Sequence, residues 1–198
     1  MSAAIPRPRA GTVLVLAGVA VLAVALAGYL QGRVWQSLHP EEVLPELPRD
    51  SPELGSVPPP PPGAPFARLK IPTMGLDVTV IEGTRSGDLL KAPGHMTGSA
   101  LPGQRENCII AGHRDLHFRK LGKLRIGNSV QLAKDGLVAT YRVESIRVIK
   151  PFETSVLDKG SEPILTLVTC YPFRYLGTAP RRYVVISRLA GISKTPPS

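Results

Sequence analysis

The hydrophobic residues of this chain follow two patterns. Residues 11–32 are uncharged and mostly apolar, and Arg33 is the first charge after them. A helix of roughly 20 such residues, rising about 1.5 Å per residue, crosses the ~30 Å hydrocarbon core of a membrane. From residue 66 onward, apolar residues come in short segments that alternate with polar ones or are rich in β-branched side chains, which is typical of strands. The pattern predicts one N-terminal transmembrane helix followed by a mainly β domain.

Seven or eight short strands are predicted between residues 66 and 190. The segments with a strand pattern are ARLKIP, DVTVIEG, NCIIAGH, NSVQLAKDG, LVATYRVESIRVI, ILTLVTC and RRYVVISRLA. The KDG at 134–136 is typical of a hairpin turn, and short helical turns are expected near 88–91 and in FETSVLD. Short strands with few helices indicate a closed β-barrel or a sandwich.

The region between these two patterns has neither of them. It is rich in proline and acidic residues, with five consecutive prolines at 58–62, and such a run favours an extended, semi-rigid polyproline conformation. We therefore expect a stalk between the helix and the domain. The predicted segments are a cytoplasmic N-terminus (1–10), a signal-anchor helix (11–32), an extracytoplasmic stalk (33–65), a folded domain (66–190) and a flexible tail (191–198).

The charges before the apolar helix predict its orientation. Arg7 and Arg9 precede it, and positive residues are retained on the cytoplasmic side, so the domain is expected outside the cytoplasmic membrane. A cleaved signal peptide is the main alternative, because ALAG at 25–28 offers small residues for cleavage. The apolar stretch is longer than the usual 7–15 residues of such peptides, and a buried core helix is a third interpretation. Both membrane interpretations export the domain.

The net charge of +9 and the pI near 9.9 favour an anionic partner. No cluster of Lys and Arg with interleaved aromatic residues is present, so we predict no nucleic-acid partner. A basic surface near an anionic membrane agrees better with export.

Three reactive or charged residues stand at predicted strand ends, where a purely structural strand would carry apolar groups. They are His113, Cys170 and Arg182. Strand alternation places Cys170 on the face of Val168, and it places Cys108 on the face opposite to His113. A thiolate is a strong nucleophile, an imidazole protonates a leaving amine, and a guanidinium donates to an oxyanion. The set suits acyl transfer through a thioester, although spacing alone leaves their meeting in space open.

Each of these residues also has a purely structural interpretation. In an exported protein Cys108 and Cys170 are able to form a disulfide, and a single cysteine is often an inert core residue. His113 as a satisfied structural histidine and Arg182 as a surface arginine like its neighbour Arg181 are the ordinary alternatives.

No metal or cofactor site is predicted. His95 stands in a Gly/Pro loop, and His117 follows His113 without an acidic partner at ligand spacing.

Several motifs together resemble the sortase family of bacterial cysteine transpeptidases. The signature T-L-x-T-C occurs in full as TLVTC at 166–170, IIAGHRD carries the family's histidine pattern, and RYVVI opens with the family's arginine. TCYPF, GTAPRRYVV, APGHMTGSALPG and NCIIAGHRDLHFRKL are most similar to class D sortases. The resemblance covers about residues 66–190 and extends to the N-terminal anchor.

The resemblance implies a fold, a site and a reaction. The fold is an eight-stranded sortase-type β-barrel with short helices. Cys170 is the implied nucleophile, His113 the general acid/base and Arg182 the oxyanion and substrate clamp, while a register shift of one residue would present Arg181 instead. Cys108 stands where the family usually has an aliphatic residue. Ca²⁺ modulates some sortases through an acidic loop, but the spaced carboxylates Glu153, Asp158 and Glu162 are more typical of a solvated loop, so no cofactor is predicted.

The implied reaction cleaves an LPxTG- or LPxTA-like sorting signal after its threonine and transfers the acyl group to an amine. The acceptor amine belongs to a cell-wall precursor or a pilin lysine, and the enzyme is a single-pass protein of the bacterial cytoplasmic membrane. The alternatives are a hydrolytic cysteine peptidase of the envelope and a non-enzymatic envelope domain with a Cys108–Cys170 disulfide.

Overall fold

The computed structural model describes residues 10–38, 60–158 and 160–194. Helix α1 spans Ala10–Leu38 and includes a segment, Val13–Gln31, that is long and apolar enough to cross a membrane. The apolar side chains of this segment are exposed rather than packed on the β domain. The helix continues to Leu38, beyond the expected end at residue 32, because residues 33–38 contain no proline or glycine and Pro40 follows only afterwards.

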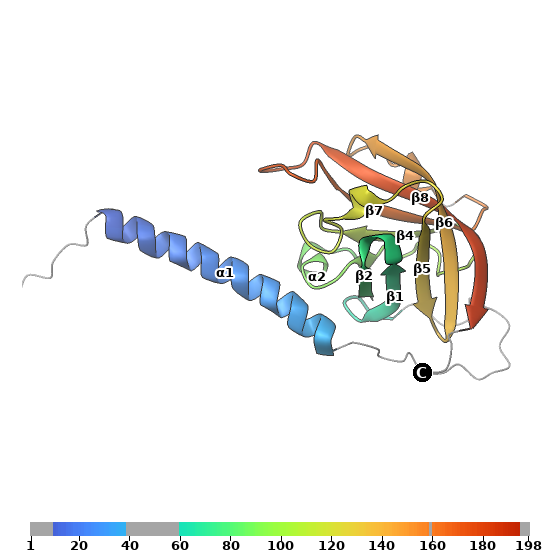
Figure 1. Cartoon of the computed structure of the whole chain (residues 1–198), viewed down its shortest axis with the longest axis horizontal. Coiled ribbons are helices and arrows are strands. Elements are labelled where there is room, and N and C mark those ends of the chain that lie inside the picture. The colour runs from blue at the N-terminus through green and yellow to red at the C-terminus, as the bar shows by residue number, and fades with distance from the viewer. Residues whose placement is uncertain (1–9, 39–59, 159, 195–198) are drawn as a thin grey trace, which may run out of the picture.

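Eight strands form a closed barrel after the helix (Figure 1). They are β1 (Pro65–Ile71), β2 (Leu76–Glu82), β3 (Gly94–His95), β4 (Asn107–Gly112), β5 (Ser129–Lys134), β6 (Leu137–Ile149), β7 (Ile164–Tyr171) and β8 (Arg181–Lys194). Around the barrel the order is β1, β2, β3, β4, β7, β8, β6 and β5, and pairing of β5 with β1 closes it. The predicted eight-stranded barrel is confirmed.

Short helical segments fill the connections, as expected. They are the 3₁₀ helix η1 (Pro72–Met74), α2 (Ser86–Leu89), η2 (Leu121–Lys123) and η3 (Ser155–Leu157). The predicted turn joins β5 to β6, where Asp135 and Gly136 both have positive φ angles, of 51° and 74°. Two successive residues of this kind are the requirement of a type I′ hairpin.

The barrel extends beyond the expected domain at both ends. Gly63 donates its N–H to the Glu82 carbonyl at 2.8 Å, and β1 begins at Pro65. At the other end, residues 191–194 were expected in the flexible tail, but they continue β8 and pair with residues 137–140 of β6. The long strand β6 offers backbone partners for these residues, so β8 extends to Lys194. Residues 195–198, and most of the predicted stalk, lie outside the described part of the chain.

Two apolar clusters occupy the two faces of the sheet around β7. The barrel interior is filled by fully buried side chains, among them Leu69, Ile110, Leu132, Leu165 and Leu167. On the other face, Val156 of η3 packs with Ile149 and Val184, and Val168 and Ile186 lie against them. The connection between β6 and β7, residues 150–163, therefore covers part of the barrel's outer face. We call this connection the β6–β7 loop.

Candidate active site

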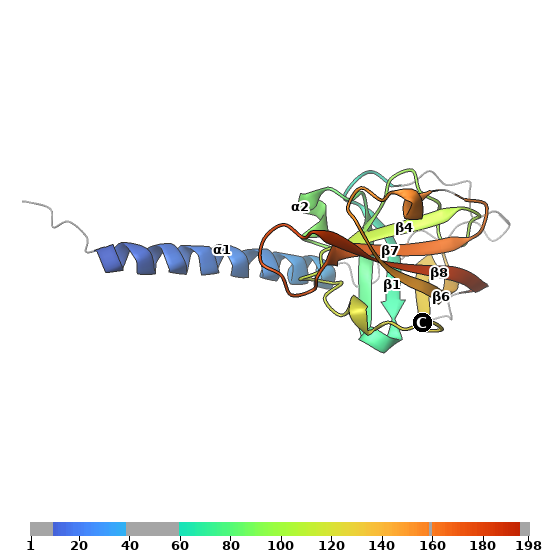
Figure 2. The ribbon, with the colours of Figure 1, turned by 90° about the horizontal axis from the view of Figure 1, so that it is seen from above.

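The strand register brings the three sequence-predicted site residues to one level of the sheet. β4 and β7 run parallel with Gly112 opposite Thr169, so His113 and Cys170 are the next residues on the two strands. β7 and β8 run antiparallel with Cys170 directly opposite Arg182. Because β4, β7 and β8 are consecutive neighbours in the barrel (Figure 2), His113, Cys170 and Arg182 lie side by side in that order.

The two directly paired residues project from the same face of the sheet. Cys170 and Arg182 are opposite one another across β7 and β8, and paired residues of adjacent strands point the same way. This is the outer face, since Leu167 at an odd spacing from Cys170 lies in the interior core. His113, Cys170 and Arg182 are each partly exposed. The three side chains at this level of the sheet are therefore accessible to solvent.

The structure distinguishes the two adjacent arginines. Arg182 projects from the same face of the sheet as Cys170. Its Nη1 donates to the carbonyls of Ala179 and Arg181 at 3.2 and 3.0 Å. Arg181 pairs with Tyr171, is exposed and projects from the opposite face. The register therefore places Arg182, and not Arg181, beside the Cys170 thiol.

Cys108 lies in a different environment from Cys170. Its side chain is 1% exposed inside the barrel, and both thiols are free. Burial, with a smaller contribution from the negative charge of Glu82, raises the pKa of the Cys108 thiol far above its ordinary value. Cys108 pairs with Leu165, five residues before Cys170 on β7, which is about 16 Å along a strand. A disulfide needs Cα atoms within about 7 Å, so the alternative of a Cys108–Cys170 disulfide is wrong.

The backbone of His113 is fixed from two sides. Thr169 donates its hydroxyl to the Gly112 carbonyl at 2.7 Å, which ties the ends of β7 and β4 together. Gly112 has no side chain, and a Cβ there would lie 2.7 Å from the Phe118 ring. The close packing of Phe118 therefore requires glycine immediately before His113 and holds the segment that follows.

Arg114 was not predicted to have a role, and the structure shows it as a buried brace. It is 8% exposed, and its guanidinium donates to the carbonyls of Pro172, Tyr175 and Gly177 at 3.1, 2.8 and 3.2 Å. These carbonyls belong to residues 172–180, the connection between β7 and β8, which we call the β7–β8 loop. Arg114 directly follows His113, so its hydrogen bonds connect the end of β4 to the β7–β8 loop between Cys170 and Arg182. In the sequence, the only indication of a role for Arg114 is its position next to His113.

A second set of polar contacts holds the β6–β7 loop over the outer face. Thr166 donates its hydroxyl to the Asn107 Oδ1 at 2.7 Å. The Asn107 Nδ2 in turn donates to the carbonyls of Val156 and Asp158 at 3.1 and 3.4 Å. Asn107 is 2% exposed, so these contacts tether the loop at a dry position below the predicted site.

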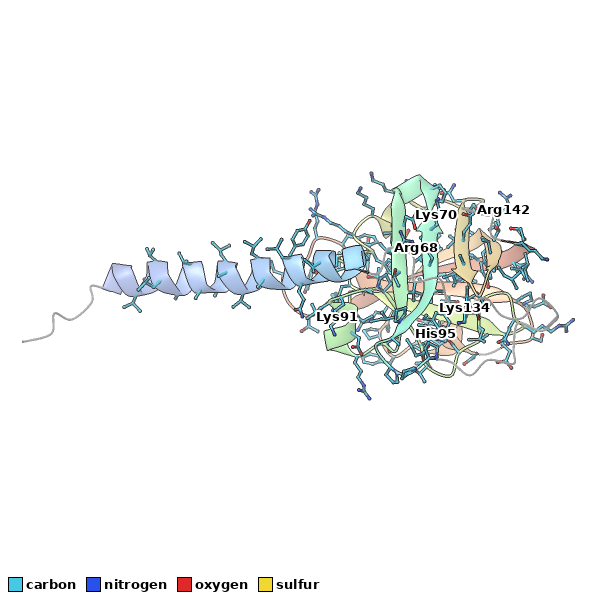
Figure 3. All side chains as sticks on the ribbon, turned by 90° about the horizontal axis from the view of Figure 1, so that it is seen from below. Arg68, Lys70, Lys91, His95, Lys134 and Arg142 are labelled. Carbon is cyan, nitrogen blue, oxygen red and sulfur yellow. The ribbon has the colours of Figure 1, made fainter. Side chains whose placement is uncertain are left out.

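His95 lies in a buried network of its own. Its Nδ1 is 2.7 Å from the Glu82 Oε2, its Nε2 is 2.8 Å from the Ser99 hydroxyl, and its ring stacks on Phe66 at 3.9 Å. The Lys134 Nζ lies 5.2 Å from the centroid of the Phe66 ring. Figure 3 shows His95 and Lys134 near one another. These contacts satisfy the imidazole inside the barrel, so His95 fits the structural interpretation.

His117 contacts a backbone carbonyl in the segment after His113. Its Nε2 lies 3.1 Å from the Lys91 carbonyl. Burial lowers the pKa of His117, the carbonyl of Lys91 opposes that shift, and the nearby His113 adds to it. His117 is therefore a neutral donor beside the predicted site.

No metal centre is formed by the residues in the described ranges. They contain no group of three or more His, Cys, Asp or Glu side chains able to hold an ion. Of the three acidic residues considered for Ca²⁺, Glu162 pairs with Arg188 at 2.8 Å.

Comparison with known proteins identifies the family. The model of the sortase domain matches residues 69–190, which is more than half of the chain. The chain belongs to the sortase family. The expected sortase fold is therefore confirmed together with the resemblance.

Individual sortases of known sequence agree with this assignment. Sortase D of Bacillus subtilis is 34% identical over 121 residues, 61% of each of the two chains. A sortase E1 of Streptomyces coelicolor is 33% identical over 130 residues, 56% of this chain and 37% of that protein. The chain thus matches only about three fifths or less of the length of these relatives.

Solved structures give the same result. A sortase D5 transpeptidase of Clostridium perfringens superposes with a TM-score of 0.61 at 30% identity, over 66% of this chain and 81% of that one. A sortase A of Listeria monocytogenes superposes with the same TM-score at 24% identity, over 67% of this chain and 92% of that one, which supports the fold alone. The expected likeness to class D sortases is confirmed by the Bacillus and Clostridium proteins.

Proposed function

We propose that this sortase is a cysteine transpeptidase that cleaves an LPxTG- or LPxTA-like sorting signal after its threonine. The observation that carries the proposal is the single level of the sheet that holds His113, Cys170 and Arg182 on three neighbouring strands. A nucleophile, a proton carrier and a fixed cation at one place supply the three functions that acyl transfer needs.

The first half of the proposed reaction forms a thioester. The Cys170 Sγ, as a thiolate, attacks the carbonyl carbon of the signal's threonine, and the carbonyl oxygen becomes an oxyanion. Arg182 donates hydrogen bonds to that oxyanion. His113, as an imidazolium, gives its proton to the amide nitrogen while the C–N bond breaks. The C-terminal piece leaves as an amine, and the acyl group remains on Cys170.

The second half transfers the acyl group. An acceptor amine attacks the thioester carbon, His113 takes the proton that the amine loses, and the C–S bond breaks to restore the Cys170 thiolate. We propose an amine of a cell-wall precursor or a pilin lysine as the acceptor. A water molecule in place of the amine gives the hydrolytic peptidase that is the remaining alternative.

The proposed location follows from helix α1. Its exposed apolar segment Val13–Gln31 and the preceding Arg7 and Arg9 support a single-pass anchor in the bacterial cytoplasmic membrane, with the barrel outside. Sorting-signal proteins that are inserted in the same membrane would then meet the site.

The product ratio tests the proposed function. The full chain in neutral detergent is incubated with LPxTA and LPxTG peptides, with and without glycinamide, and the products are followed by mass spectrometry. Formation of the amide product, dependent on Cys170 and retained in Cys108→Ala, is expected. Peptide cleavage that yields only the free acid at every amine concentration would assign the site to hydrolysis.

A further inference from the structure

The tip of the β7–β8 loop presents large apolar side chains to solvent. Leu176 is 98% exposed and its neighbour Tyr175 is exposed as well. The loop projects beyond the strands of the barrel (Figure 1). An apolar side chain in such a position gains free energy from any surface that removes it from water. We call Tyr175 and Leu176 the apolar tip.

The fold holds the apolar tip in this position. The Nη2 of the buried Arg114 donates to the carbonyls of Tyr175 and Gly177 at 2.8 and 3.2 Å, one on each side of Leu176. The guanidinium carbon of Arg114 also lies 5.9 Å from the centroid of the Tyr175 ring. Because the backbone is bound inward on both sides of Leu176, its side chain is directed away from the barrel.

Basic side chains surround the apolar tip. Four cations line the same hollow of the surface as the tip: Arg119, Lys120, Lys123 and Arg174. We call these four residues the tip cations. The one acid in that hollow, Asp115, lies 3.3 Å from the Arg114 Nε. Among the residues that the structure describes, no acid pairs with a tip cation, whereas Arg68 and Arg188 elsewhere on the barrel each have an acidic partner.

A second apolar protrusion lies at the same end of the barrel. Phe152 is 85% exposed and stands just past the end of β6, which pairs there with the start of β8. Lys150 and Arg181 are exposed nearby, and Glu153 is the acid adjacent to Phe152. The end of the barrel that carries the predicted site is therefore apolar at its protrusions and mainly basic around them.

We propose that the apolar tip inserts into an anionic lipid surface while the tip cations contact lipid phosphate groups. The end of the barrel that carries the predicted site then rests on the membrane. Exposed apolar side chains on a basic surface are the combination that binds the interface of an anionic bilayer. The inference goes beyond the transpeptidase reaction, and it rests on the proposed membrane anchor.

Charge and chain length favour a lipid surface as the partner. The net charge of +9 has the sign that anionic lipids attract, and an anchored domain needs only weak contacts to stay on the surface. Residues 39–59 join α1 to the barrel and reach at most roughly 70 Å. The longest strand, β8, has 14 residues and measures about 45 Å. The connection is therefore long enough for this end of the barrel to reach the bilayer.

Tryptophan reporters at two places on the barrel test the docking. Trp35→Phe removes the only native tryptophan. In that background, Leu176→Trp is the tip reporter, and Ile192→Trp is the matched control at an exposed apolar position near the other end of β8. The full chain is reconstituted in vesicles of phosphatidylglycerol with brominated acyl chains, which quench a tryptophan that enters the bilayer. We expect the tip reporter to lose emission and shift to shorter wavelength, while the control reporter keeps its emission.

Matched double variants test the part played by charge. In the tip-reporter chain, Lys123→Gln with Arg174→Gln removes two tip cations. The ratio of docked to undocked tip, read from the quenched share of emission, is expected to fall about 30-fold for two basic side chains near an anionic surface. Arg105→Gln with Lys194→Gln removes the same charge from exposed positions outside this surface and should keep the ratio. Salt near 1 M, which screens charges more than about 3 Å apart, should release the tip.

The outcomes separate docking from the anchor and from catalysis. In the native chain, quenching of Trp35, which follows Val13–Gln31, reports insertion of α1, so an unquenched Trp35 overturns the anchor. An unquenched tip reporter overturns the docking whether or not Trp35 is quenched. Thioester formation in detergent tests the transpeptidase without either.

Three further results would overturn the docking proposal. One is equal quenching of the tip and control reporters. Another is the same docked ratio in vesicles of brominated phosphatidylcholine alone, because the surface would then not depend on anionic lipid. The third is a tip reporter whose emission shifts with an added sorting peptide and not with lipid, which would assign the apolar tip to the protein substrate.

Discussion

Cys170 and Cys108 carry the same chemical group in two environments. Cys108 is buried in the barrel interior, where a thiolate is strongly disfavoured, whereas Cys170 is partly exposed beside Arg182. Nucleophilic chemistry requires the thiolate, so only Cys170 has the surroundings of a nucleophile. The two thiols differ because Cys108 lies on the inner face of β4 and Cys170 on the outer face of β7.

The two neighbouring arginines should differ sharply in their effect on catalysis. Arg182→Lys is expected to lower kcat/KM for peptide cleavage by about 10²- to 10³-fold, the typical loss of an oxyanion donor, because an ammonium does not replace the planar fork of donors. Arg181→Lys is the matched control, since its side chain points away from Cys170. Steady-state kinetics with a sorting peptide measure both. Equal losses, or a larger loss at Arg181, would contradict the register.

His117 should make stability depend on pH. Its pKa is lowered in the native state by burial, so below about its ordinary value of 6.5 the unfolded chain takes up a proton that the folded chain does not. The free energy of unfolding therefore falls as the pH drops from 7 to 5, and above 7 His117 contributes no slope. His117→Gln keeps a donor for the Lys91 carbonyl and should flatten the slope. Melting temperatures in neutral detergent test this, and an unchanged slope would exclude His117 as a source.

At the scale of elements, the buried side chain of Asn107 tethers the β6–β7 loop, in addition to the apolar contacts of Val156. Asn107→Ala removes the two donated bonds to the loop and leaves the Thr166 hydroxyl without its acceptor. Leaving buried polar groups unpaired costs about 1–3 kcal/mol, so amide hydrogen exchange in residues 150–163 is expected to accelerate.

A second asparagine provides the control. The Asn128 Oδ1 accepts from the Arg125 N–H in an exposed turn at 2.9 Å, and Asn128→Ala should leave exchange in residues 150–163 unchanged. Equal exchange of that loop in the native chain and in Asn107→Ala would show that the tether does not hold it.

Strand alternation could be predicted from the sequence, but strand pairing could not. The pattern in ILTLVTC placed Cys170 on the face opposite to Leu167, and the barrel confirms that placement. Nothing local indicates that residue 113 stands beside residue 170, because this parallel register joins residues 57 positions apart and depends on the closed barrel. The sortase resemblance supplied that link before the structure did.

The burial of polar residues could not be predicted from the sequence either. Arginine is almost always exposed unless it is paired, so no sequence pattern predicts Arg114 in a buried position with three carbonyl partners. The end of β8 was missed for a related reason, since GISK at 191–194 has little strand propensity and is ordered by its pairing with β6. In both cases non-local partners decide the outcome.

At the scale of the whole molecule, we propose that helix α1 anchors the barrel to the membrane. The chain expressed in bacteria is expected in the membrane fraction and to resist alkaline extraction, because Val13–Gln31 is long enough to span the bilayer. Protease added outside spheroplasts should digest the barrel in place. Release of a soluble chain that lacks residues 1–28 would instead support cleavage after the small residues at 25–28.

In the proposed acyl transfer the Cys170 Sγ is the attacking atom. This role is tested most directly by intact-mass measurement of the full chain, mixed with an LPxTA or LPxTG peptide and no amine, followed by acid quenching and peptide mapping. We expect a hydroxylamine-sensitive acyl adduct on Cys170, unchanged in Cys108→Ala and absent in Cys170→Ala. An adduct on Cys108, or no adduct across a panel of sorting peptides that the chain nevertheless cleaves, would contradict it.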